Sequence, residues 1–238
     1  MKIRNTPRFW TLLHKWIGIV IGIQLLLWIA GGLYMSAVPL NWVHGTPLLN
    51  NTTLNQVRPP SGYPISINVS DYQSIEWVSR LGKPVLKTTD SFGVDAFFEP
   101  QQSARSFALV PLPLVSEREI RAQSIQRYAG SGSLVSVSLL DSPPPEASGI
   151  TEPVYRVNFD DWINTSFYMH RYTGEVLKVR SDLWRLFDIF WMLHIMDYES
   201  REDFNNPLLI LSAVIALFFT VTGMMLVFFW LKRGRQSH

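Results

Sequence analysis

The stretch that decides the fold is His14–Tyr34, HKWIGIVIGIQLLLWIAGGLY. The run Trp16–Met35 within and beside it has 20 residues, and Gln24 is its one strongly polar side chain. A transmembrane helix needs about 20 apolar residues to cross the hydrocarbon of a bilayer. The stretch therefore predicts a membrane-spanning helix near the start of the chain.

A second apolar run, Pro207–Leu231, has 25 residues and no charge, so it is also long enough to span. The mean hydropathy of the whole chain is only +0.10, which excludes a polytopic bundle. Most of the chain between the two runs is polar enough to be a water-exposed domain.

The charges predict an orientation. Seven basic and no acidic residues flank the two runs: Lys2, Arg4, Arg8, Lys15, Lys232, Arg233 and Arg235. The segment between the runs holds the other 14 basic and all 19 acidic residues, a net charge of −5. Basic flanks stay in the cytoplasm, so both termini are predicted inside, with about 170 residues outside. The pI of 8.9 comes from these flanks and predicts no nucleic-acid partner.

The first run is expected to be a retained anchor. A signal peptide has a shorter apolar region and a small-x-small cleavage site, whereas Tyr34-Met35-Ser36 is a poor site. The chain has no cysteine, which excludes disulfides, thiolate metal sites, iron–sulfur clusters and c-type haem attachment.

Composition divides the chain into seven segments. They are a cytoplasmic tail (1–10), a first transmembrane helix (11–36), a Pro-rich linker (37–64), an outer domain (65–180), an interfacial helix (182–198), a second transmembrane helix (207–231) and a second cytoplasmic tail (232–238). The 182–198 helix is expected to lie on the outer membrane surface, because it begins amphipathic and then becomes almost wholly apolar.

The outer domain is predicted to be α+β, with two units that each pack a helix on an antiparallel sheet. The expected elements are a helix over Asp71–Leu81, a hairpin of Lys83–Thr89 and Val94–Glu99, a strand over Ser106–Val110, a helix opened by the capping box Ser116–Glu119 and ended near Ala129, and strands over Leu134–Leu140, Val154–Phe159, Ser166–His170 and Glu175–Val179.

Several of these motifs resemble the PepSY family. Val154-Tyr155-Arg156-Val157, Phe167-Tyr168-Met169-His170 and Thr173-Gly174-Glu175-Val176 are similar to the two strands and the TGEV turn of a PepSY unit. Leu13-His14-Lys15-Trp16, Leu193-His194 and Val221-Thr222-Gly223 are similar to elements of the PepSY-associated transmembrane family.

The resemblance implies a bacterial inner-membrane protein with a periplasmic PepSY-type domain. Larger members of that family have four spans and include siderophore-type ferric reductases with b-type haem, whereas this chain has two predicted spans. We therefore expect an accessory or partner-binding subunit of an envelope redox or iron-uptake system that is not an enzyme by itself. The alternatives are a b-haem electron-transfer protein of ferric-reductase type, and a periplasmic peptidase regulator.

His14 is the sharpest candidate for chemistry. It shares a helix face with Gly18 and Gly22, at i, i+4 and i+8. Imidazole is a haem ligand, and glycines one turn away would let a macrocycle approach the backbone. The same spacing is a small-xxx-small seam for packing two helices, including a homo-oligomer through Gly18 and Gly22. Both interpretations stay open.

His194 is the second candidate haem ligand, and it lies in an apolar setting near the outer leaflet. One monomer cannot use His14 and His194 on one haem, because a 20-residue helix is about 30 Å long. An interfacial histidine is the alternative.

Other polar residues point to structural roles. Gln24 is expected to hydrogen-bond a neighbouring helix. The acidic residues Asp197, Glu199, Glu202 and Asp203 could attract cations but are expected to form a solvated connector. Asp160-Asp161 reads as a turn, while His44 and His170 stand alone and predict no metal site. No nucleophile or phosphate-binding motif is present.

Overall fold

The computed structural model describes residues 7–50, 72–103 and 106–234 of the chain. The chain forms two compact units. Residues up to Leu40 and from Leu186 onward form a helical unit, and Asn41–Arg185 form a central domain. Each unit is described by itself.

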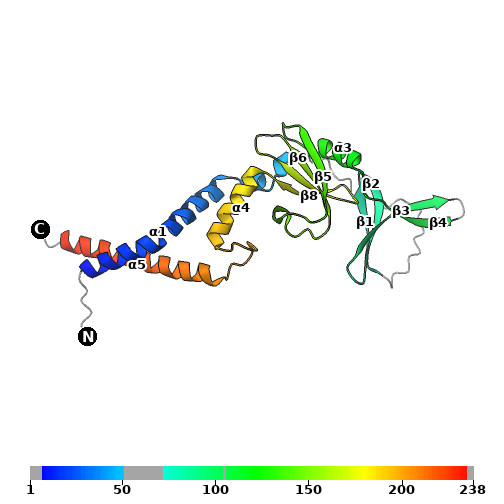
Figure 1. The fold of residues 1–238 in the computed structure, drawn as a ribbon. Coiled ribbons are helices and arrows are strands. Elements are labelled where there is room, and N and C mark those ends of the chain that lie inside the picture. The colour runs from blue at the N-terminus through cyan, green and yellow to red at the C-terminus, as the bar shows by residue number, and fades with distance from the viewer. Residues whose placement is uncertain (1–6, 51–71, 104–105, 235–238) are drawn as a thin grey trace. The chain divides into compact units, whose positions relative to one another are not determined.

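The helical unit is built on two long helices, α1 (Pro7–Ala37) and α5 (Pro207–Gly234), which pack against each other (Figure 1). Residues Leu186–Ile195 of α4 (Asp182–Ile195) also belong to this unit. His14 and Gly18 of α1 contact α5 at Thr222 and Phe219 respectively, so the helices run antiparallel.

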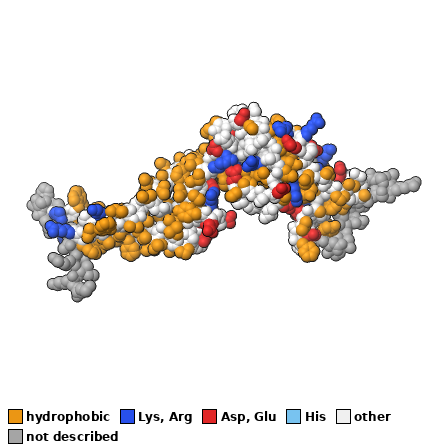
Figure 2. Space-filling view, viewed as in Figure 1, with side chains coloured by type: hydrophobic (Ala, Val, Ile, Leu, Met, Phe, Trp, Pro, Cys, Tyr) orange, Lys and Arg blue, Asp and Glu red, His pale blue; other side chains and the backbone are white. Residues whose placement is uncertain are grey.

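Both long helices expose their apolar side chains. Each contains a window long and hydrophobic enough to cross a membrane, and few side chains in these windows are buried. Figure 2 shows hydrophobic side chains over the visible face of the two helices. A core helix of a soluble protein would be buried, so the exposure indicates membrane anchoring. The two predicted spans are thus present as two candidate membrane-spanning helices.

The α4 helix packs along α1. A Cβ added to Gly31 would lie 3.2 Å from the Phe190 ring, and the rings of Tyr34 and Phe190 lie 5.3 Å apart. Gln24 Nε2 donates to the Leu193 carbonyl at 3.0 Å, which is the interhelical bond expected of Gln24. The expected helix after residue 182 is present, and its position at a membrane surface stays a prediction.

The central domain contains two four-stranded antiparallel sheets, each with its strands in sequence order. Together with its helices they confirm the predicted α+β class. The strands are β1 (Tyr72–Arg80), β2 (Lys83–Asp90), β3 (Asp95–Ser103), β4 (Ser106–Pro111), β5 (Leu134–Leu140), β6 (Val154–Phe159), β7 (Ser166–His170) and β8 (Val176–Arg180).

The first strand corrects a prediction. We expected a helix over Asp71–Leu81, but Tyr72–Arg80 is strand β1, paired antiparallel with β2. Leu81 and Gly82 both have positive φ, 49° and 84°, which is the backbone of a two-residue hairpin turn. Pairing along β2 outweighs the local helical pattern. Asp71 itself lies outside the described residues.

The second sheet carries the main core. Helix α3 (Glu117–Arg127) packs on β5 and β6 and is opened by the predicted capping box, with Ser116 and Glu119 bonded reciprocally. Its Ile120 is fully buried in a cluster with Val157, Phe167 and Met169. The opposite face of this sheet is more polar and meets the loop that contains the short helix η3 (Pro145–Ala147).

Part of the predicted linker is packed into the domain. Residues after α1 form α2 (Leu40–Val43) and η1 (Thr46–Leu48), and Leu48 is buried. Leu49 bridges Tyr128, and the Asn50 N–H donates to the Arg127 carbonyl at 2.8 Å. The rest of the linker, 51–64, lies outside the described residues.

Candidate functional site

His14 makes a polar contact between the two long helices. Its Nδ1 lies 2.9 Å from Thr222 Oγ1 and 3.2 Å from the Phe219 carbonyl oxygen. Its ring stacks on the Phe219 ring, with centroids 4.1 Å apart and planes at 14°. Thr222 is 2% exposed, so the contact is inside the helix pair. Two motif elements at opposite ends of the chain thus meet.

The hydrogen bonds assign the tautomer of His14. The Phe219 carbonyl only accepts, and the Thr222 hydroxyl already donates to that carbonyl at 2.8 Å. The proton of a neutral His14 ring is therefore on Nδ1, and Nε2 carries the lone pair. Within the described residues Nε2 has no hydrogen-bond partner. A metal-binding histidine has the same arrangement, with one ring N–H held by an oxygen and the other nitrogen left basic.

The two glycines on the His14 face have different surroundings. A Cβ added to Gly18 would lie 2.8 Å from the Phe219 ring, whereas one added to Gly22 would meet nothing within 4 Å. Gly223 on α5 lies against His14 in the same way, at 3.2 Å from Cε1. Gly18 therefore belongs to the contact between α1 and α5, and its face is filled by Phe219. No described atom lies against the Cα of Gly22 on the side where a side chain would project.

His194 lies far from His14. It sits at the end of α4, with its ring 6.0 Å from that of Trp28. Trp28 is 14 residues beyond His14 on α1, which is about 21 Å along the helix. The structure therefore does not bring the two histidines together, and the haem-ligand role of each stays a prediction.

Asp197 organises the acidic segment between α4 and α5. Its carboxylate accepts backbone N–H groups from Glu199, Ser200, Glu202 and Asp203 at 3.0–3.2 Å, and the Ser200 hydroxyl at 2.6 Å. These bonds, the Ser200 hydroxyl first, hold the pKa of Asp197 far below its ordinary value. Across the described part of the chain, no three His, Asp or Glu side chains are grouped to hold a metal ion. Asp197 thus acts as the centre of a connector.

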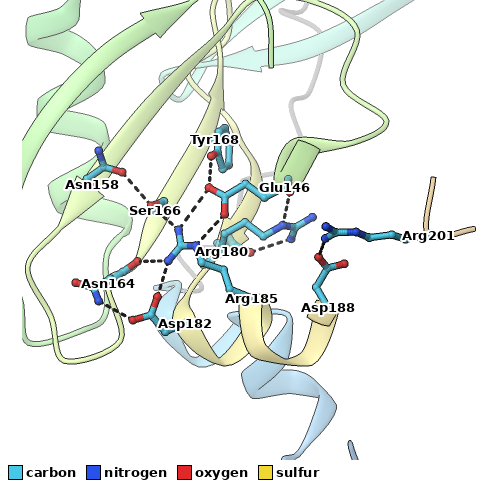
Figure 3. Close-up of polar contacts among 11 residues, drawn as sticks. Glu146, Asn158, Asn164, Ser166, Tyr168, Arg180, Asp182, Arg185, Asp188 and Arg201 are labelled. Carbon is cyan, nitrogen blue, oxygen red and sulfur yellow. Dashed lines mark hydrogen bonds and ion pairs between the residues drawn. The ribbon is translucent and has the colours of Figure 1, made fainter. Parts of the chain in front are cut away.

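A second polar cluster lies on the polar face of the second sheet (Figure 3). Arg185, in the first turns of α4, directs all five N–H groups to acceptors: both carboxylate oxygens of Glu146, Asp182 Oδ1, Ser166 Oγ and the Asn164 carbonyl. The closest pair is Nε with Glu146 Oε2, at 2.8 Å. Tyr168 on β7 also donates its hydroxyl to Glu146. We call these residues the Glu146 cluster.

Glu146 is held as a carboxylate. Burial alone would raise its pKa, but hydrogen bonds from Arg185 and Tyr168 outweigh burial and lower the pKa. Burial, followed by the bond to Glu146, raises the pKa of Tyr168. A group that stays ionised and fully paired near neutral pH is a poor proton donor or acceptor in catalysis. The cluster instead fixes the start of α4 on the sheet.

A cavity of about 330 Å³ adjoins this cluster. Its polar lining is a hydrogen-bonded chain in which Asn158 donates to Ser136 at 2.9 Å and Ser166 donates to Asn158 at 2.9 Å. Sequence reasoning missed this face. Alternation along β5–β7 was the available signal, but Glu146 and Arg185 are 39 residues apart and no local pattern links them.

Asp161 is more than the turn residue we expected. It is 7% exposed and accepts hydrogen bonds from the Tyr128 hydroxyl at 2.7 Å and from the N–H and hydroxyl of Thr165 at 2.8 and 2.6 Å. Burial and the bond to Asp161 raise the pKa of Tyr128 to about 12. Asp161 thus ties the β6–β7 loop to the end of α3.

Two aromatic side chains of the central domain are exposed in loops. Phe92, at the tip of the β2–β3 hairpin, is 90% exposed, and Trp162, in the β6–β7 loop, is 77% exposed. Exposed aromatic residues are enriched in protein–protein interfaces. The sequence places Phe92 in the turn between the two predicted hairpin strands, but neither Phe92 nor Trp162 was predicted to be a binding residue.

The chain matches no family model, no curated protein and no solved structure.

Proposed function

We propose that this chain is a membrane-anchored accessory subunit of PepSY type, with both termini in the bacterial cytoplasm and the central domain in the periplasm. It would lack catalytic activity of its own and would dock its domain on a protein of an envelope redox or iron-uptake system. The observation that carries this proposal is a pair of long helices with exposed apolar side chains, which pack on each other through His14 and Thr222. In the sequence they flank a separate domain whose loops expose aromatic side chains.

The orientation is supported by the charge of the flanks and is tested by labelling. The chain has no cysteine, so single cysteines at Ser91 and Ser237 are unique labels. In intact inner membranes a membrane-impermeant maleimide should label Ser91→Cys from the periplasmic side, and Ser237→Cys only after disruption. The reverse pattern would contradict the orientation.

Partner docking is tested by photo-crosslinking in cells. A crosslinking amino acid at Phe92 or Trp162 should give an adduct with a redox or iron-uptake protein of the envelope, whereas one at the exposed Ser131 should not. Uncrosslinked chain at all three positions would refute the accessory role. An adduct with a peptidase would favour the peptidase regulator instead.

A second candidate function, a b-haem electron-transfer protein, is favoured by the free Nε2 of His14. Nε2 of His14 could bind a haem iron. Gly18, however, cannot lie against the macrocycle as predicted, because the Phe219 ring covers this glycine. A haem on this histidine would therefore have to reach Nε2 from elsewhere, such as a second copy of the chain. Protein purified from haem-replete cells should then show a Soret band that His14→Ala removes. Colourless wild-type protein would exclude this candidate.

A further inference from the structure

The turn after β7 depends on an unprotonated ring nitrogen. His170 Nδ1 lies 3.2 Å from the Tyr172 backbone nitrogen and 3.1 Å from that of Thr173, and both N–H groups donate to it. Backbone N–H groups only donate, so Nδ1 must carry a lone pair and the ring proton must be on Nε2. The neutral ring thus takes the place of a backbone acceptor for this turn.

The same turn carries the contact between the two sheets. The Leu81 N–H donates to the Thr173 carbonyl at 3.1 Å, and Arg80 donates to the Tyr172 carbonyl at 2.8 Å. Phe97 of β3 stacks on Tyr172 at 5.0 Å and meets the edge of His170 at 5.1 Å. We call these contacts the sheet joint. His170 therefore lies next to the contacts that hold the first sheet against the second.

Protonation of His170 would reverse the role of Nδ1. A histidinium donates from both nitrogens, so the N–H groups of Tyr172 and Thr173 would face a donor and lose their acceptor. A half-buried N–H without an acceptor is costly. The carbonyls of the same two residues hold Leu81 and Arg80, so a displaced turn would carry the sheet joint with it.

The charges around His170 are mixed. On the first sheet Lys87 and Asp95 form an ion pair at 2.8 Å, and on the other side Arg171 and Glu152 form one at 3.5 Å. Glu152 and Asp95 favour a charged ring, while Lys87 and Arg171 oppose it. Burial is the largest influence and lowers the pKa of His170 below its ordinary value.

We propose that His170 makes the sheet joint sensitive to pH, with the neutral ring closing the joint and protonation releasing the first sheet. Because the closed form prefers the neutral ring, the joint has its full stability above the ordinary histidine value of about 6.5. That stability is lost as the pH falls below this value, by up to about tenfold in the opening equilibrium for each pH unit until the closed form protonates.

The experiment is amide hydrogen exchange on the full chain in detergent, at pH 7.5 and 5.0. The matched variant is His170→Asn, because an asparagine side-chain oxygen accepts the same N–H groups and does not titrate. Comparing the two proteins at each pH removes the intrinsic pH dependence of exchange. At pH 7.5 the amides of Leu81, Tyr172 and Thr173 should exchange equally. At pH 5.0 they should exchange at least about fivefold faster in the wild type.

Two further variants complete the test. His170→Ala should exchange fast at both pH values, because it has no acceptor, and protection equal to wild type would overturn the proposal. His44→Asn, at an exposed histidine of the same domain, should behave as wild type. Equal pH dependence in wild type and His170→Asn, or its loss in His44→Asn, would also overturn the proposal.

Discussion

At the scale of the residue, the contact of His14 with Thr222 shows how a polar group is accommodated between two apolar helices. The imidazole N–H has two acceptors, the Thr222 hydroxyl and the Phe219 carbonyl, and its ring lies on an aromatic face. Hydrogen bonds between membrane helices contribute about 0.5–1.5 kcal/mol each. The contact between His14 and Thr222 thus contributes little to the free energy of unfolding and mainly specifies how the two helices pack.

Thr222→Val should weaken the helix pair. Valine keeps the shape of threonine but removes the hydroxyl, so His14 is left with only the Phe219 carbonyl. We expect a loss of about 0.5–1.5 kcal/mol, measured as a lower midpoint of thermal unfolding of the chain in detergent. The control is Thr220→Val, because within the described residues the Thr220 hydroxyl bonds to the Ala216 carbonyl of its own helix and to no other helix. An equal effect of both substitutions would contradict a specific role of Thr222.

Glu146→Gln should destabilise the central domain at neutral pH. The substitution leaves Arg185 without its main counter-charge, and because both side chains are partly exposed we expect a loss of about 1–3 kcal/mol. The folded pKa of Glu146 is lowered, so its contribution is present above the ordinary glutamate value and is lost as the pH falls below it.

Urea unfolding at several pH values checks this prediction. The wild type should lose stability as the pH falls from about 5 to about 3, through and below the ordinary glutamate value, and Glu146→Gln should lose less over that interval. Glu117→Gln is the control, because its ion pair with Arg121 is exposed and should contribute nearly nothing. A steeper acid loss in Glu146→Gln than in wild type would refute the assignment.

At the scale of the element, α1 presents two glycines in different roles. Gly18→Ala places a methyl group against Phe219, whose ring is held by the stack on His14, so we expect a loss of about 1–3 kcal/mol from overpacking. Gly22→Ala meets open space and should be neutral or slightly stabilising, because alanine favours the helix. The two variants are compared by thermal unfolding in detergent. The opposite order would place the seam at Gly22.

The elements also show how far local sequence patterns reach. The capping box before α3 and strand β5 (Leu134–Leu140) occur where alternation and capping predicted them, because those signals are properties of neighbouring residues. Strand β1 was expected to be a helix, since its hydrophobic spacing suits either structure. Pairing with β2 decided between the two, and pairing is a contact that a single segment does not encode.

At the scale of the whole molecule, the central domain has a core that owes nothing to the long helices. The cluster around Ile120, Phe167 and Val157 lies entirely within Asn41–Arg185. A chain of residues 41–188, which keeps the start of α4 and its Arg185, should therefore be soluble, fold alone and unfold cooperatively in urea. An aggregated product, or one without a cooperative transition, would show that the domain needs its membrane helices.

Some properties of this protein follow from the sequence alone. The length and apolarity of Trp16–Met35 and Pro207–Leu231 are sufficient to predict two membrane-length helices. The thickness of the bilayer sets the number of apolar residues that a spanning helix needs, and this number can be read from the sequence. The α+β class follows from alternation and turn residues in the segment between them. Only the tertiary structure decided that His14 bonds to Thr222 and that Glu146 pairs with Arg185. It also decided that His170 accepts hydrogen bonds from the turn that contacts the first sheet. These contacts depend on how distant segments approach one another, whereas helix length and strand alternation depend on residues that are already neighbours in the chain.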